Sequence, residues 1–302
     1  MKEIPLVSIL MNCFNGEEYL QEAIDSVISQ TYENWELIFW DNQSTDKSAE
    51  IFLKNKDQRL HYYYSPSHTI LGAARSAAIK KVKGDWIAII DTDDVWRSDK
   101  LTKQIGAVMN AGSIQNSIGL VYSRVMGIDK NSIITKEVCH KDYLGIPMPE
   151  GRILHDLLFK GNFIMSPSIL INTKFFSSVG GFPEDYLNAP DYYISCAISS
   201  KANVICVDEF LTQYRIHDNN LTIKQKVISY EEQIKIFLIW SECVNSSLIE
   251  KTIKIKQLHT FAGLMMIKYN KQIIKGLLRI IRNGSLFFGI KNIILELNKL
   301  SK

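Results

Sequence analysis

The sequence predicts an α/β protein in which a mostly parallel β-sheet is flanked by helices, with a helical extension at the C-terminal end. Over the first hundred residues, short apolar runs alternate with segments whose apolar residues recur every three to four positions. The apolar runs are continuous, as expected for strands that are buried on both faces of a sheet. This alternation favours parallel strands joined by right-handed helical crossovers.

The elements follow in order along the chain. The expected strands are Val7–Met11, Trp35–Trp40, Leu60–Tyr64 and Trp86–Ile90, and the expected helices are Glu17–Gln30, Asp46–Lys54 and Gly72–Lys83. The middle of the chain is less regular, with strands expected at Gly119–Met126, Ser168–Ile171 and Val204–Val207 and a helix at Ile153–Phe159. Beyond Thr222 the pattern is helical and contains no proline. We therefore expect one domain over residues 1–222 and a helical region over residues 223–302.

The composition is that of a globular protein without a nucleic-acid partner. Of 302 residues, 46% are hydrophobic and 22% are charged, and the net charge of +3 is too small to indicate nucleic-acid binding. Five scattered cysteines without a C-x-x-C pair disfavour a disulfide framework or a zinc site and fit a reducing cytosol. With no signal peptide and no apolar run of about 18 residues, we expect a cytoplasmic protein that at most lies on the inner face of the cytoplasmic membrane.

An acidic run follows the fourth expected strand directly. Three carboxylates within Asp91–Asp94 repel one another, and a divalent cation such as Mg²⁺ or Mn²⁺ relieves this repulsion while bridging the protein to phosphate. The alternative is an acidic turn in which Asp93 or Asp94 caps a following helix. Because ligands of parallel sheets bind beyond the carboxyl ends of the strands, the position favours the metal.

Two further sites lie near strand or helix ends. Asp41, after the second strand, can accept hydrogen bonds from a nucleobase or ribose, whereas Ser44 to Asp46 read equally well as turn and capping residues. Arg75 lies one turn into its helix, where a cation suits an anionic ligand, although such an arginine is more often part of a surface salt bridge.

Two candidates lie further along the chain. Asp191 follows the loop Gly180–Pro183, and its alternative role is a solvated or capping residue. His217 ends the run Tyr214–His217, and a lone histidine is more often structural than a ligand.

Taken together and in this order, these segments resemble the family 2 glycosyltransferases, which have the GT-A fold, and in particular members of bacterial surface-polysaccharide assembly. The matching segments are Val7–Asn15, Asp41–Asp46, Leu71–Ala77, Gly84–Trp96, Gly180–Asp191 and Tyr214–Asp218, so the resemblance spans about Pro5 to Thr222. The sequence departs from the family pattern at Asn42, Ser76 and Pro190, which replace a frequent Asp, the usual Asn and a common Glu.

The resemblance implies a role for each candidate residue. Asp191 is implied as the general base. The donor nucleotide is implied to bind at Asn12, Asn15, Asp41, Arg75, Asp91 and Thr92, the metal at Asp93, Asp94 and His217, and Arg215 belongs to the closing motif.

The implied activity is an inverting, metal-dependent transfer of a hexosyl group. The donor is implied to be a nucleotide-diphosphate sugar, with UDP favoured by family frequency, and the acceptor a hydroxyl of a glycan or lipid-linked oligosaccharide. The alternative is a catalytically silent sugar-nucleotide-binding or scaffold subunit. A nicotinamide dehydrogenase, a P-loop enzyme and a nucleotidyltransferase are disfavoured, because the loop after the first strand lacks their glycine-rich phosphate motifs.

The C-terminal tail is basic and amphipathic. From Lys271 onward there are seven basic residues and one acidic residue, beside an apolar stripe at helical spacing. This pattern fits an anionic membrane surface, and it fits equally well packing on the catalytic domain or on a second subunit in a homodimer.

Overall fold

The structure is a computed structural model that describes residues 4–138, 143–218, 220–221, 225–268, 275–276 and 279–280. Its contacts divide the chain into two compact units. The first unit comprises Met1–Tyr186 and Pro190–His217, and the second comprises Leu187–Ala189 and Asp218–Lys302. The sequence-based boundary after residue 222 stays a prediction.

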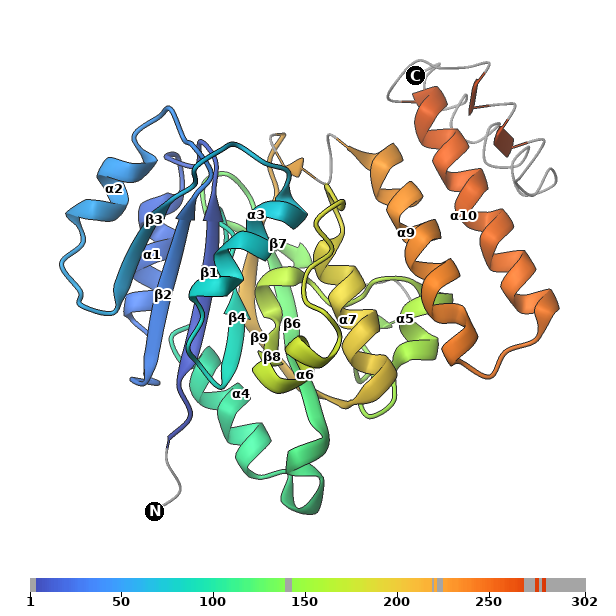
Figure 1. The fold of residues 1–302 in the computed structure, drawn as a ribbon, viewed down its shortest axis with the longest axis horizontal. Coiled ribbons are helices and arrows are strands. Elements are labelled where there is room, and N and C mark those ends of the chain that lie inside the picture. Colours follow the sequence, from blue (N-terminus) through green and yellow to red (C-terminus); the bar gives the residue numbers. More distant parts are fainter. Residues whose placement is uncertain are drawn as a thin grey trace. The chain divides into compact units, whose positions relative to one another are not determined.

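A nine-stranded sheet forms the centre of the first unit within the described residues (Figure 1). Its strands are β1 (Val7–Cys13), β2 (Trp35–Asp41), β3 (Leu60–Tyr64), β4 (Trp86–Ile89), β5 (Val95–Trp96), β6 (Ile118–Ile128), β7 (Ile134–Glu137), β8 (Leu170–Asn172) and β9 (Asn203–Arg215). Their order is β3-β2-β1-β4-β8-β6-β9-β5, with β7 on β6. The first four strands pair in parallel, β8 runs antiparallel to both of its neighbours, and β6 and β9 are again parallel. The predicted α/β fold with a mostly parallel sheet is confirmed.

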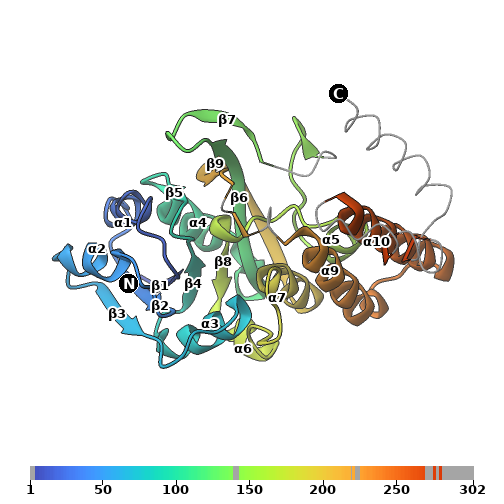
Figure 2. The ribbon, with the colours of Figure 1, turned by 90° about the horizontal axis from the view of Figure 1, so that it is seen from above.

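Helices cover both faces of this sheet (Figure 2). They are α1 (Leu20–Ile28), α2 (Ser48–Lys54), α3 (Leu71–Ala78), α4 (Lys100–Met109), α5 (Leu154–Lys160), α6 (Thr173–Ser178) and α7 (Pro190–Lys201). The helices α1, α2 and α4 lie on one face, and α3, α6 and α7 lie on the other. Alternate strand residues such as Val7, Ile9 and Met11 form a buried core with α1 and α4. Burial of these apolar faces stabilises the layers.

Strand β9 is much longer than the expected strand at Val204–Val207. It continues to Arg215, pairing in parallel with β6 along its length and antiparallel with the short strand β5. Because β5 follows the acidic run at once, this pairing brings Arg215 and His217 to Asp93 and Asp94. The extended β9 therefore places residues 215 and 217 beside the acidic run Asp91–Asp94.

The second unit contains α9 (Lys226–Trp240) and α10 (Leu248–Lys268), which lie side by side (Figure 1). The rings of Tyr230 and Phe261 stack with centroids 5.5 Å apart, joining the two helices. None of the described helices is long and apolar enough to span a bilayer. Most of the basic amphipathic tail, including Lys271, Arg282 and every residue after it, lies outside the described residues, so its predicted role remains untested.

Candidate active site

The carboxyl ends of the parallel strands bring the first candidates together. In the sheet register Cys13 lies opposite Asp41, and Asn12 opposite Trp40, while Asp91 follows the end of β4 on the other side of β1. The amide of Asn12 is buried, and neither its oxygen nor its nitrogen has a hydrogen-bond partner among the described residues. Buried polar groups are normally paired, so the Asn12 side chain is suited to binding a ligand at this edge.

Asp41 is fully buried and holds its own loop. Its Oδ1 accepts the Ser44 N–H at 2.7 Å, and its Oδ2 accepts the Tyr62 hydroxyl at 2.7 Å. Burial and the neighbouring Asp41 carboxylate raise the pKa of Tyr62, so the phenol remains a donor. Asp41 thus places the loop beyond β2, and a nucleobase would share its oxygens with these donors.

The loop after β1 is tied to the loop after β2. Asn15 adopts a positive φ of 54°, and its side-chain oxygen accepts the Thr45 N–H at 2.8 Å. Asp46 accepts the backbone N–H of Ser48, the first residue of α2, and of Glu17 in the loop after β1. Thr92 packs beside Gly16, where an added Cβ would lie 2.7 Å from the Thr92 hydroxyl. Asn15 and Thr92 therefore lie in tightly packed loops at the rim of the candidate site, beyond the carboxyl ends of β1 and β4.

Arg75 is the centre of the site. Only 2% of it is exposed, so it is not a surface salt-bridge residue. Its Nη2 donates to Asp91 Oδ1 at 3.0 Å and to Ser166 Oγ at 3.2 Å, and its Nη1 lies 3.6 Å from Asp191 Oδ1. Its Nε and Nη1 have no hydrogen-bond partner among the described residues. One buried guanidinium thus joins two carboxylates that are 100 positions apart in the chain.

Both carboxylates beside Arg75, Asp91 and Asp191, have raised pKa values. Burial raises the pKa of Asp91, and the carboxylates of Asp93 and Asp191 add to this rise against the opposing charge of Arg75. Burial also raises the pKa of Asp191, while Arg75 and backbone N–H groups at the start of α7 oppose the rise. A carboxylate with a raised pKa is a stronger base, which is the property a proton-accepting residue needs.

The acidic turn meets the end of β9. His217 Nε2 lies 2.9 Å from Asp93 Oδ2, and the imidazole ring packs on the ring of Tyr19. Asp94 is fully buried, and its Oδ1 accepts the backbone N–H of Arg215 at 2.9 Å. Burial and the charges of Asp93 and Asp91 raise the pKa of Asp94 well above its usual range. Neither Asp93 nor Asp94 caps a helix, because β5 follows and α4 begins only at Lys100.

Arg215 is a structural hub. Its side chain is fully buried, donates to the Asp93 carbonyl at 2.9 Å and to Glu22 at 2.5 Å, and lies over the ring of Tyr19. The Arg215 guanidinium also donates to the Ser132 hydroxyl, just before β7. Arg215 therefore fixes the backbone of the acidic turn.

The pair of Asp93 and His217 fits a divalent cation as a partial ligand set. Carboxylate and imidazole are both Mn²⁺ ligands, and Mg²⁺ is commonly held by one or two carboxylates together with substrate phosphates. The described residues contain no group of three or more His, Cys, Asp or Glu side chains that could hold a metal ion. Any cation at this pair would therefore take its remaining ligands from a bound phosphate and water.

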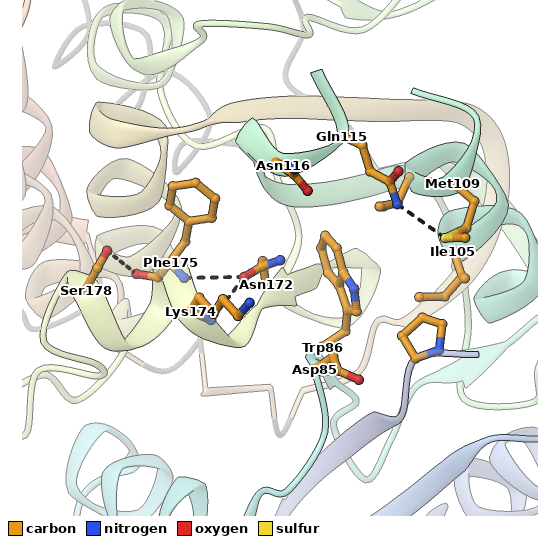
Figure 3. A pocket seen from close by; sticks show the side chains of 12 residues that line it. Asp85, Trp86, Ile105, Met109, Gln115, Asn116, Asn172, Lys174, Phe175 and Ser178 are labelled. Atoms are coloured by element: carbon orange, nitrogen blue, oxygen red, sulfur yellow. Dashed lines mark hydrogen bonds between the residues drawn. The ribbon is translucent and has the colours of Figure 1, made fainter. Parts of the chain in front are cut away.

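A hollow of about 700 Å³ lies at the opposite end of the strands, by Pro5, Trp86 and Phe175 (Figure 3). Here β1 and β4 begin. The polar side chains around it are used locally: Asn172 accepts the N–H of Lys174 at 3.0 Å, and the Ser178 hydroxyl donates to the Phe175 carbonyl. Asp91, Asp93 and Asp191 do not line this hollow.

Several residues of the site were not predicted. Ser166 holds Arg75, Tyr62 holds Asp41, and Glu22 holds Arg215. None of them belongs to a repeated or charged pattern in the sequence. Only the three-dimensional arrangement reveals them.

Comparison with known proteins identifies the family of this chain. The model of the family "Glycosyl transferase family 2" matches residues 8–176. The uncharacterized glycosyltransferase MJ1057 of Methanocaldococcus jannaschii is 31% identical over 236 residues, covering 75% of this chain and 77% of the relative. The Escherichia coli protein UDP-Glc:alpha-D-GlcNAc-diphosphoundecaprenol beta-1,3-glucosyltransferase WfgD is 27% identical over 219 residues, covering 72% and 79%.

A solved structure shares the fold. The mannosyltransferase PcManGT of Pyrobaculum calidifontis, in complex with GDP-Man and Mn²⁺, superposes with a TM-score of 0.62 at 16% identity, covering 99% of this chain and 81% of its own. The chain belongs to glycosyl transferase family 2 and is a transferase, and the GT-A fold expected from the resemblance is confirmed.

Proposed function

We propose that this transferase moves a sugar from a UDP-sugar, with inversion, to a hydroxyl of a glycan or lipid-linked oligosaccharide in surface-polysaccharide synthesis. The observation that carries the proposal is the buried Arg75, which contacts Asp91 at 3.0 Å and Asp191 at 3.6 Å. Two of its nitrogens, Nε and Nη1, have no hydrogen-bond partner among the described residues. A buried cation with unpaired donors suits the anionic part of a nucleotide sugar. The name of the relative WfgD, a UDP-glucose-dependent transferase acting on a diphosphoundecaprenol substrate, supports the donor and acceptor classes.

The residues divide between donor and acceptor. Asn12, Asp41 and Asp91 lie at the strand ends, where the nucleoside would bind, with Asn15 and Thr92 at the rim. Asp191 lies across Arg75 from Asp91, so an acceptor hydroxyl placed there would lose its proton to Asp191 as its oxygen attacks the anomeric carbon. The bond to the diphosphate breaks on the opposite side. A single displacement of this kind inverts the anomeric configuration.

A divalent cation completes the proposal. Asp93 and His217, with Asp94 behind them, would hold Mn²⁺ or Mg²⁺, which neutralises charge on a departing diphosphate when bound. The Mn²⁺ in the PcManGT complex supports this class of cofactor. A lipid-linked acceptor would also bring the protein to the inner face of the cytoplasmic membrane.

The test combines donor binding with transfer. Thermal-shift screening of UDP-glucose, UDP-N-acetylglucosamine and GDP-mannose, with and without Mn²⁺, should identify a donor that stabilises the folded protein. Asp191→Asn should then lower the release of nucleoside diphosphate by about 10²–10⁴-fold, the usual contribution of a general base, and leave donor affinity unchanged. The matched control is Asp185→Asn, at an exposed position of the same segment. Full activity of Asp191→Asn, or no stabilisation by any nucleotide sugar, would contradict the proposal.

A further inference from the structure

A buried carboxylate on α9 binds the segment that precedes the candidate base. Glu232 is 4% exposed. Its Oε1 accepts the Leu187 N–H at 2.6 Å, and its Oε2 accepts the N–H groups of Asn188 at 3.0 Å and Ala189 at 2.7 Å. Burying a charged group is costly unless it is hydrogen-bonded, and three backbone donors supply that compensation. Glu232 is thus built to hold three consecutive amides.

These three residues occupy an unusual place in the chain. Leu187–Ala189 belong to the second unit, whereas Tyr186 before them and Pro190 after them belong to the first. Between Tyr186 and Pro190, only these three residues belong to the second unit, and Glu232 accepts a hydrogen bond from the backbone of each. The Glu232 carboxylate therefore holds the backbone of residues 187–189.

Both ends of the segment lead to the active site. On the preceding side, the Tyr186 carbonyl accepts the Gly72 N–H at 2.8 Å, in the first turn of α3, the helix that carries Arg75. A Cβ at Gly72 would collide with the backbone oxygens of Pro183 and Tyr186, so this approach requires glycine. On the following side, Pro190 begins α7 with its restricted φ, and Asp191 is the next residue.

We propose that Glu232 is a positioning residue for Asp191. By fixing the three amides before Pro190, it sets the start of α7 and with it the 3.6 Å separation between the Asp191 carboxylate and Arg75. Glu232 contacts neither donor nor acceptor in this proposal. The inference rests on the proposed role of Asp191 as the base.

The test replaces Glu232 with Gln, which keeps the shape but turns one acceptor oxygen into an N–H donor that faces backbone N–H groups. A displacement of about 1 Å of a reacting group can cost roughly 10²-fold in rate. We expect kcat for nucleoside-diphosphate release from the donor found by thermal shift to fall by about 10–100-fold, with the donor KM changed less than about threefold. Amide hydrogen exchange should speed up over residues 187–195. Glu232→Asp, which keeps the charge with a shorter reach, should restore part of kcat.

The matched control is Glu231→Gln on the same helix, because Glu231 pairs with Arg279 at 2.6 Å and not with residues 187–189. It should leave kcat and the exchange of residues 187–195 unchanged. Wild-type kcat in Glu232→Gln, or an equal loss of donor affinity and kcat in both Glu232 variants, would overturn the positioning role. If the wild-type protein released no nucleoside diphosphate from any donor, the proposed function would fail on its own. The exchange of residues 187–195 would still decide whether Glu232 holds the start of α7.

Discussion

Removing the Arg75 guanidinium should destabilise the fold and abolish activity together. Arg75→Met keeps most of the side-chain volume but leaves Asp91 and Asp191 without their shared cation. Breaking a buried ion pair by removing one partner costs about 3–5 kcal/mol. Because Asp91 is partly exposed, we expect a loss near the lower end, about 3 kcal/mol. For a unit of this size that corresponds to a fall in Tm of roughly 6–12 °C.

The loss should depend on pH in a defined direction. Without Arg75, the folded-state pKa values of Asp91 and Asp191 rise further above those of the unfolded chain. A carboxyl group whose folded pKa is raised keeps its stabilisation below the unfolded pKa and loses it as the pH rises through the folded pKa. The destabilisation of Arg75→Met should therefore be smaller at about pH 4.5, roughly half a unit above the unfolded Asp pKa of about 3.9, than at about pH 8.

The assay is urea denaturation of both proteins at several pH values, with Arg75→Lys as the conservative variant. Lysine retains the charge but cannot bridge Asp91, Ser166 and Asp191 as a planar fork does, so it should restore only part of the stability. A difference below about 1 kcal/mol that does not change with pH would refute the pairing, since that is the size of an exposed ion pair.

Two further predictions concern the acidic turn and a buried lysine. Asp93→Ala should remove the Mn²⁺-dependent part of donor affinity, measured by calorimetry. The control is Asp99→Ala, which removes an acid that pairs with Arg97 beyond the turn and should keep this part of the affinity. Unchanged donor affinity in Asp93→Ala would exclude Asp93 as a metal ligand. Lys100 is fully buried, its amine donates to Gln104 at 2.8 Å, and burial lowers its pKa well below the usual range. In the pH window between the folded and unfolded pKa values of Lys100, only the unfolded chain holds this proton. As the pH rises through this window, the free energy of unfolding of the wild type should therefore gain up to about 1.4 kcal/mol per pH unit relative to Lys100→Met. A stability difference that stays constant from about neutral pH to about pH 10, near the ordinary lysine pKa of about 10.4, would contradict this.

The strands that are buried on both faces could be predicted from the sequence, because short, continuous apolar runs bounded by turn residues are typical of such strands. Strand β9 was underestimated because its second half, from Asp208 to Arg215, begins with two acidic residues and shows no regular alternation of polar and apolar residues. Its pairing with β5 depends on a strand of only two residues. Strand β7 is exposed and carries no apolar signal. Tertiary pairing, not local pattern, forms these elements.

The places of several candidate residues could be predicted. Asp41 ends β2, Asp91 follows β4 and Arg75 lies in α3, as expected, while their roles in donor binding stay predictions. Their partners Tyr62 and Ser166 come from distant segments and have ordinary side chains, so no spacing rule finds them. The same holds for Glu232, whose partners are backbone amides and leave no trace in the sequence.

The acidic turn shows how the structure changes the original physical argument. From the sequence, three carboxylates in four residues favoured a bound cation that relieves their repulsion. In the fold each carboxylate has its own partner: Arg75 for Asp91, His217 for Asp93, and the Arg215 backbone N–H for Asp94. The turn is therefore held by the protein itself, with the last residue of β9 and the segment just after it supplying two of the three partners. A cation bound by Asp93 and His217, as proposed above, would compete with the contact between these two side chains.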